Sequence, residues 1–206
     1  MSTIATTNIK EPSSATNNIT LTSGGDTTIS GDTTISGNAT ISGNATVTGT
    51  LTFPPNAGQV LQVVNFQTGE YNSGTTVIPL DDTIPQNTEG DEYMTLTITP
   101  TSASSKLLIE ISALLGSNAA KWVVGAIFQD TTADALAGGY YYEPNGGAGK
   151  ELTIRHYMTA GTTSATTFKF RAGVHTSGGT LYFNGSNARY LGGVAASSIT
   201  ITEIAT

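Results

Sequence analysis

The N-terminal part of the chain repeats its polar and apolar positions every six residues. Within residues 25–53 each hexad carries one glycine and, in constant register with it, one large apolar residue; these are Ile29, Ile35, Ile41, Val47 and Phe53. A repeat of fixed period decides the architecture before local propensities do. One buried apolar residue, a glycine for the corner and Thr, Ser or Asn elsewhere are typical of β-helical winding. The pattern therefore predicts a short β-helical segment.

The number of hexads indicates how many chains form this segment. One coil of a triangular β-helix takes about three hexads of a single chain, so the five hexads present make too few coils to bury a continuous core. If three chains run side by side, each hexad adds one layer of about 4.8 Å, and the rod is roughly 25 Å long. We therefore predict a homotrimeric shaft over residues 21–56. A low-complexity Gly/Ser/Thr linker is the alternative interpretation, but it leaves the common register of Ile and Gly unexplained.

The segments on either side of the repeat differ from it in composition. Residues 1–20 are polar and irregular, which predicts an extended arm that attaches the shaft to a partner, or alternatively an ordinary frayed terminus. Pro54 and Pro55 end the repeat, because proline stops β pairing. A separate head domain is expected over residues 57–206.

Longer stretches of alternating apolar and polar residues follow in the head domain. Apolar residues share one face in Met94–Ile98, Leu107–Leu115, Leu152–Met158 and Phe168–Val174. Residues 59–66 are expected to form a short buried strand, and Trp122 to lie in the core. Turns rich in Gly, Asn and Ser separate about eight to ten such strands, without a convincing helical period. The predicted fold is all-β, an antiparallel jelly roll or β-sandwich.

Composition excludes several classes of function. The net charge is −7 with only 8 Lys and Arg residues, whereas nucleic-acid binding needs a basic face. The chain has no Cys, so it has neither a disulfide framework nor a thiolate metal site. No apolar run approaches the ~20 residues of a membrane span, and the N-terminus lacks the basic and apolar regions of a signal peptide. We expect no nucleic-acid partner, no membrane insertion and no cofactor.

No catalytic constellation stands out either. The two histidines are His156 and His175, and His156 shares an apolar face with its neighbours, which favours a hydrogen-bonded core or interface residue over a general base. Acidic residues cluster over residues 81–92 and offer oxygen ligands to Ca²⁺, but they lack the specific order of a calcium loop, so a solvated loop is the favoured interpretation. Arg155, Arg171 and Arg189 are candidates for polar contacts across subunits.

Three consecutive tyrosines are the best candidates for recognition. Tyr140, Tyr141 and Tyr142 are flanked by Gly138-Gly139 and by Asn145-Gly146-Gly147. Tyrosines on a Gly-rich loop give rigid amphipathic area with a hydroxyl group, which suits stacking against a sugar or a protein receptor. Alternatively, alternate tyrosines pack within a strand and the others line a trimer interface.

Three separated stretches resemble a known family. The stretches are VLQVVNF at residues 60–66, LTITPTSASSKLLIEISA at residues 96–113 and SSITITEIA at residues 197–205. In this order they resemble the C-terminal domain of many tail-fibre proteins of tailed bacteriophages. The resemblance implies a trimeric jelly roll of the kind shared with complement C1q-like and tumour-necrosis-factor-like heads, in a virion protein that ends a fibre. The chain is short for a long tail fibre and shows no recognisable baseplate-binding domain before the shaft.

Three functions follow as hypotheses. The first is a structural virion protein, a homotrimeric tail fibre that is anchored to another virion protein through residues 1–20 and whose head adheres to a glycan or protein of the host surface. The second is a capsid decoration or head-fibre protein whose arm lies on the shell. The third, a polysaccharide-degrading tailspike enzyme, is disfavoured because it needs a longer β-helix with a carboxylate pair, and Asp26 and Asp32 are the only charges between Pro12 and Gly69. The expected location is the virion tail, alternatively the capsid surface, and no enzyme is expected.

Overall fold

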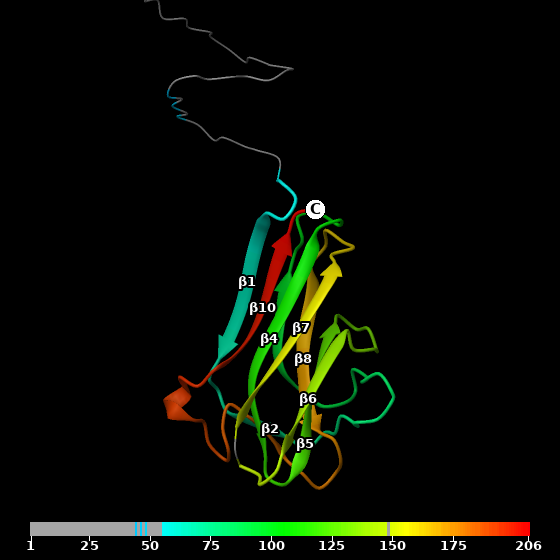
Figure 1. The fold of residues 1–206 in the computed structure, drawn as a ribbon, viewed down its shortest axis with the longest axis vertical. Helices are drawn as coiled ribbons and strands as arrows, with labels where there is room; N and C mark the ends of the chain where they lie inside the picture. Colours follow the sequence, from blue (N-terminus) through cyan, green and yellow to red (C-terminus); the bar gives the residue numbers. More distant parts are fainter. Residues whose placement is uncertain (1–43, 45, 47, 49–54, 148) are drawn as a thin grey trace, which may run out of the picture. The chain divides into compact units, whose positions relative to one another are not determined.

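The computed structural model describes residues 44, 46, 48, 55–147 and 149–206 (Figure 1). The attachment arm (residues 1–20) and the five apolar shaft positions Ile29, Ile35, Ile41, Val47 and Phe53 lie outside the described residues. The β-helical shaft, its trimeric state and the domain boundary at residues 56/57 therefore stay predictions.

The described residues form an all-β structure whose regular elements agree with the alternation in the sequence. The elements are β1 (Val60–Thr68), β2 (Asn72–Gly74), β3 (Asp91–Ile98), β4 (Lys106–Ser117), β5 (Lys121–Gln129), β6 (Ala137–Glu143), β7 (Lys150–Thr159), β8 (Thr166–Val174), β9 (Leu181–Phe183), the short 3-10 helix η1 (Leu191–Gly193) and β10 (Ser197–Ile204).

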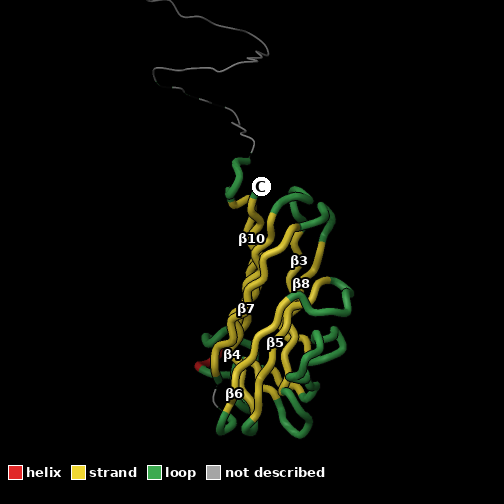
Figure 2. Tube along the Cα trace, turned by 45° about the vertical axis from the view of Figure 1, so that its right-hand side comes forward, coloured by secondary structure: helices red, strands yellow, loops and turns green. Residues whose placement is uncertain are grey.

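The strands form two antiparallel sheets that face each other. One sheet has the order β1-β10-β4-β9-β2, with β7 also paired to β4, and the other has the order β3-β8-β5-β6. Figure 2 shows the two layers from the side, with β10, β4 and β7 in one and β3, β8 and β5 in the other. The prediction of an antiparallel β-sandwich is confirmed.

The pairing of the strands is nested along the chain. The antiparallel pairs are β1–β10, β2–β9, β3–β8, β4–β7 and β5–β6. The chain therefore folds as one long hairpin, with its innermost turn between β5 and β6, that is wound into two sheets. This winding is the arrangement of a double-sheet jelly roll. It also places the C-terminus beside the start of β1, where Gly58 N donates to Ala205 O at 2.8 Å (Figure 1).

Alternate residues of the strands fill the space between the sheets. On β4 the inward residues from Leu107 to Leu115 are fully buried, and on β8 Phe168 and Phe170 meet them from the opposite sheet. Successive side chains of a strand point to opposite faces, so one face of each sheet packs in the core and the other faces outward. The faces predicted for residues 94–98, 107–115, 152–158 and 168–174 are those that the structure buries or half-buries.

The expectation of a buried strand at residues 59–66 is wrong. The strand β1 does form there, but it is an edge strand that pairs with β10 alone among the described residues. Val60, Val63 and Phe66 are exposed, Val63 by 57%. An apolar run indicates strand formation, whereas its burial depends on how many neighbours the strand has, which is decided by distant segments of the chain.

A loop over residues 75–90, here called the covering loop, closes part of the outer face of the four-stranded sheet. On β5, a Cβ at Gly125 would point into the core toward Leu152 and Phe170. The alternate residues Val124, Ala126 and Phe128 therefore point to the outer face. All three are nevertheless buried. The covering loop supplies the buried Ile78 on this side. Its backbone approaches β8 so closely that a Cβ at Gly173 would lie 2.4 Å from Thr76 O.

Candidate functional site

The strand β6 presents its three tyrosines to two different sides. Tyr140 and Tyr142 are 58% and 44% exposed, whereas the hydroxyl of Tyr141 donates to Leu115 O on β4. Burial raises the pKa of Tyr141 above its ordinary value, so its hydroxyl stays a hydrogen-bond donor. The alternation of a strand thus leaves two of the three tyrosines available for recognition and uses the third in packing.

Trp122 completes an exposed aromatic patch, defined here as Trp122, Tyr140 and Tyr142. Trp122 stands opposite Tyr142 in the β5–β6 register. Its ring lies 5.6 Å from that of Tyr140 in an edge-on arrangement at 70°, and 5.1 Å from that of Tyr142 at 52°. The expectation that Trp122 belongs to the core is wrong, because its side chain points to the outer face beyond the reach of the covering loop and is 36% exposed.

The backbone beneath the aromatic patch is held by His175. The residue follows β8, and its Nδ1 accepts a hydrogen bond from Trp122 N at 3.2 Å, while its own N–H donates to Trp122 O at 3.0 Å. The next outward position of β5 is Val124, which is buried opposite Tyr140. These contacts fix the backbone at the start of β5, from which the Trp122 side chain projects.

A shallow pocket, here called the acidic pocket, opens beside the aromatic patch. Its volume is about 320 Å³, and it is lined by Asp81, Asp82, Thr83, Ile84, Pro85, Ala135, Ala137 and Gly138. Gly138 and Tyr140 are two residues apart on β6 and share its outer face, since both are exposed. The acidic pocket and the aromatic patch therefore adjoin along β6, where the backbone positions of Gly138 and Tyr140 are about 7 Å apart.

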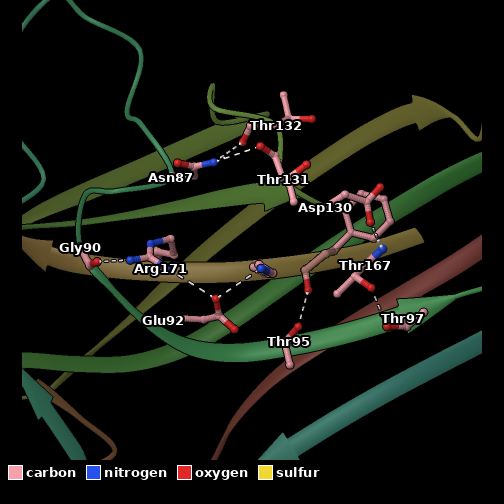
Figure 3. Close-up of polar contacts among 12 residues, drawn as sticks. Asn87, Gly90, Glu92, Thr95, Thr97, Asp130, Thr131, Thr132, Thr167 and Arg171 are labelled. Atoms are coloured by element: carbon pink, nitrogen blue, oxygen red, sulfur yellow. Dashed lines mark hydrogen bonds and ion pairs between the residues drawn. The ribbon is translucent and has the colours of Figure 1, made fainter. Parts of the chain in front are cut away.

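The wall of the acidic pocket is fastened to the β5–β6 turn. Asn87 donates from Nδ2 to the carbonyls of Thr131 and Thr132, each at 3.1 Å, and Ala135 N donates to Pro85 O at 2.9 Å. Figure 3 shows Asn87 reaching this turn. The covering loop is therefore held on this turn at Pro85 and Asn87, whereas the side chains of Asp81 and Asp82, in the middle of the loop, are exposed.

Arg171 fastens the C-terminal end of the covering loop. From the outer face of β8 its guanidinium donates to Glu89 O at 2.9 Å and to Gly90 O at 2.7 Å, and it lies 3.5 Å from the carboxylate of Glu92 (Figure 3). Lys169 adds a second cation 3.8 Å from the Glu92 carboxylate. Arg171 thus orders the loop within the chain.

The carboxylates of residues 81–92 bind different partners within the chain. Asp91 accepts from Thr76, Glu89 accepts from Gln86 N, and Glu92 pairs with the two cations of β8. Asp81 accepts from both the hydroxyl and the N–H of Thr83, and these hydrogen bonds lower the pKa of Asp81. In the part of the chain that the structure describes, no group of three or more His, Cys, Asp or Glu side chains is placed to hold a metal ion.

The other predicted residues lie away from the aromatic patch. His156 is half-buried on the inward face of β7, as its spacing indicated, and burial lowers its pKa. Arg155 pairs with Glu110 at 2.9 Å, and Arg189 lies 3.5 Å from Glu70, so both have partners within the chain. The sequence did not predict the exposure of Trp122 or the acidic pocket. The alternation of β5 does place Trp122 on the same face as Val124 and Phe128, but the sequence does not show which part of that face the covering loop buries.

Across the residues that the structure describes, no helix has the length and apolar character to cross a membrane. No protein-family model matches the chain, and no curated protein sequence matches it. The resemblance to tail-fibre proteins therefore rests on the three stretches quoted above.

Several solved structures are similar to the chain at low identity. The VP2 subviral particle of infectious bursal disease virus is 9% identical, with 71% of this chain and 39% of VP2 covered and a TM-score of 0.31. Dimeric latent PorU from Porphyromonas gingivalis is 8% identical, with 72% of this chain and 14% of PorU covered and a TM-score of 0.33. The enzymatically active domain of tailspike protein 4 from bacteriophage CBA120 is 16% identical, with 59% of this chain and 18% of the tailspike chain covered and a TM-score of 0.25. The chain spans well under half of each, and at these TM-scores the likeness supports no conclusion about function.

Proposed function

We propose that this chain is a structural virion protein, a homotrimeric tail fibre whose β-sandwich adheres to the surface of the host cell. The observation that carries the proposal is the aromatic patch. Trp122, Tyr140 and Tyr142 are large, mutually packed rings that the paired strands β5 and β6 present on the outside of the sandwich. Aromatic residues of this kind are enriched at recognition surfaces because they contribute area at a low cost in conformational entropy.

The rest of the chain supports the proposal through its sequence. The hexads of residues 25–53 favour a trimeric shaft, and residues 1–20 are proposed to bind another virion protein. Three copies of a weak site on one fibre would bind more tightly than one copy, because the second and third contacts form at high effective concentration. Binding without catalysis is proposed for the sandwich.

Adsorption of virions to host cells tests the proposal. The purified full chain in excess should slow the adsorption of virions that carry it, whereas the double variant Trp122→Ala/Tyr140→Ala should compete at least about fivefold less well, since each ring contributes roughly 0.5–1.5 kcal/mol. Equal competition by the parent and the double variant would contradict the role of the aromatic patch.

The position of the chain in the virion distinguishes a tail fibre from a capsid decoration protein. Labelling of the chain in virion images should show it at the tail. Many copies spread over the shell would instead assign it to capsid decoration, and absence from purified virions would overturn a virion role.

A further inference from the structure

The aromatic patch and the acidic pocket lie side by side, and we propose that they form one binding site for a neutral, hydroxyl-rich glycan. One sugar ring stacks on Tyr140, and hydroxyls of the adjoining ring donate hydrogen bonds to the carboxylates of Asp81 and Asp82. This inference rests on the proposed function, because it names the class of ligand to which the sandwich adheres.

The geometry of the aromatic patch suits stacking by a sugar. The ring of Trp122 meets that of Tyr140 edge-on at 70°, so Trp122 does not cover Tyr140 face to face, and Tyr140 keeps 58% of its surface exposed. The face of an aromatic ring carries the negative part of its quadrupole, which attracts the weakly positive C–H groups on the apolar side of a hexose. Tyr142 extends the same surface along β6.

The acidic pocket supplies the polar half of the site. Ionised carboxylates accept hydrogen bonds and donate none, so Asp81 and Asp82 match the hydroxyl donors of a sugar. The hydrogen bonds from Thr83 that lower the pKa of Asp81 keep this carboxylate ionised. Two carboxylates on one loop repel a ligand that carries its own carboxylate, and this repulsion discriminates against acidic sugars.

The spacing along β6 joins the two halves. Gly138 lines the acidic pocket and precedes Tyr140 by two residues on the same face, a separation of about 7 Å, which is comparable to the span of one sugar ring. The absence of a side chain at Gly138 leaves the passage open: a Cβ there would approach Gly125 O at 3.3 Å and nothing else within 4 Å. A larger residue at Gly138 would fill the passage.

Fluorescence of the full chain tests the site directly, because Trp122 is the single tryptophan of the sequence. The probes are neutral oligosaccharides of glucose, galactose and N-acetylglucosamine, each compared with a matched sugar that carries a uronic acid. We expect at least one neutral sugar to change the Trp122 fluorescence saturably, and the matched acidic sugar to bind at least about fivefold more weakly. Tyr140→Ala should weaken the binding by about 2- to 12-fold.

Two further variants and one control separate this site from a general effect. Gly138→Leu should weaken neutral-sugar binding by blocking the passage, and the double variant Asp81→Asn/Asp82→Asn should reduce the discrimination against acidic sugars. Tyr157→Ala, on the exposed face of β7 and 56% exposed in the parent, should bind as the parent does. Circular dichroism and thermal unfolding verify that each variant is folded.

Three outcomes would overturn the inference: no saturable change with any neutral sugar, equal binding of neutral and acidic sugars, or unchanged binding in folded Gly138→Leu. If sugars fail while virion adsorption still depends on Trp122 and Tyr140, the adhesion proposal stands and the ligand is a protein. If sugars bind as expected while the chain is absent from virions, the glycan site stands and the virion function fails.

Discussion

At the scale of single residues, a buried carboxylate joins three segments at one end of the sandwich. Glu203 of β10 accepts hydrogen bonds from Thr101 N at 2.8 Å, from Ser105 Oγ at 2.6 Å and from Gln62 Nε2 at 2.6 Å. Burial would raise the pKa of Glu203, but the hydrogen bonds from Ser105, Gln62 and Thr101 outweigh it and hold this pKa below its ordinary value. A buried charge is tolerated only when it is satisfied in this way.

Replacement of this carboxylate should destabilise the protein in a pH-dependent manner. Because the folded-state pKa of Glu203 is depressed, its contribution is present above the ordinary carboxyl pKa of 4.5 and is lost as the pH falls through the folded-state pKa. Glu203→Gln should lower the free energy of unfolding by about 1–3 kcal/mol at neutral pH, since an amide leaves some donors unpaired. Urea unfolding should show the difference from the parent shrinking at lower pH.

The control for Glu203 is Glu110, whose carboxylate pairs with Arg155 on an exposed surface. Glu110→Gln should change the free energy of unfolding by less than about 1 kcal/mol. A Glu203→Gln effect that is as small as this, or that stays constant from neutral to acidic pH, would contradict the assigned role of the carboxylate.

At the scale of elements, the covering loop decides which part of the four-stranded sheet meets solvent. Phe128 and Ala126 lie on the same outward column of β5 as Trp122, but they are buried and Trp122 is exposed. The difference arises because the covering loop crosses β8 at Gly173 and reaches the β5–β6 turn, where Asn87 of the loop donates a hydrogen bond to Thr131 O. The same loop brings Asp81 and Asp82 to the side of Gly138.

The close approach at Gly173 predicts a strong effect of a single methyl group. In Gly173→Ala the new Cβ would lie 2.4 Å from Thr76 O, a backbone atom that must then move. We expect a loss of about 1–3 kcal/mol in the free energy of unfolding and faster proteolytic cleavage within residues 75–90. Gly138→Ala, with its nearest contact at 3.3 Å, should show a smaller loss, and equal stability of the parent and Gly173→Ala would count against this account of the loop.

At the scale of the whole molecule, the predicted shaft decides the number of chains. If the hexads wind three chains together, Ile35 and Ile41 lie in a shared core, and the double variant Ile35→Asp/Ile41→Asp should leave the sandwich folded but shift the solution mass from trimer toward monomer. Multi-angle light scattering measures the mass, and circular dichroism verifies the β content. A monomeric parent would overturn the trimer, and a variant that assembles like the parent would favour the linker interpretation.

The sequence by itself determined the β character of residues 57–206 and the face of most strands. These properties are local, because the side chains of a strand alternate with a period of two wherever the strand lies. Only the tertiary structure decided that β1 is an edge strand, that Trp122 is exposed and that Asp81 and Asp82 line a pocket with Gly138. These properties depend on pairings between distant segments, such as β1 with β10 and the covering loop with the β5–β6 turn, and short-range patterns carry no record of such pairings.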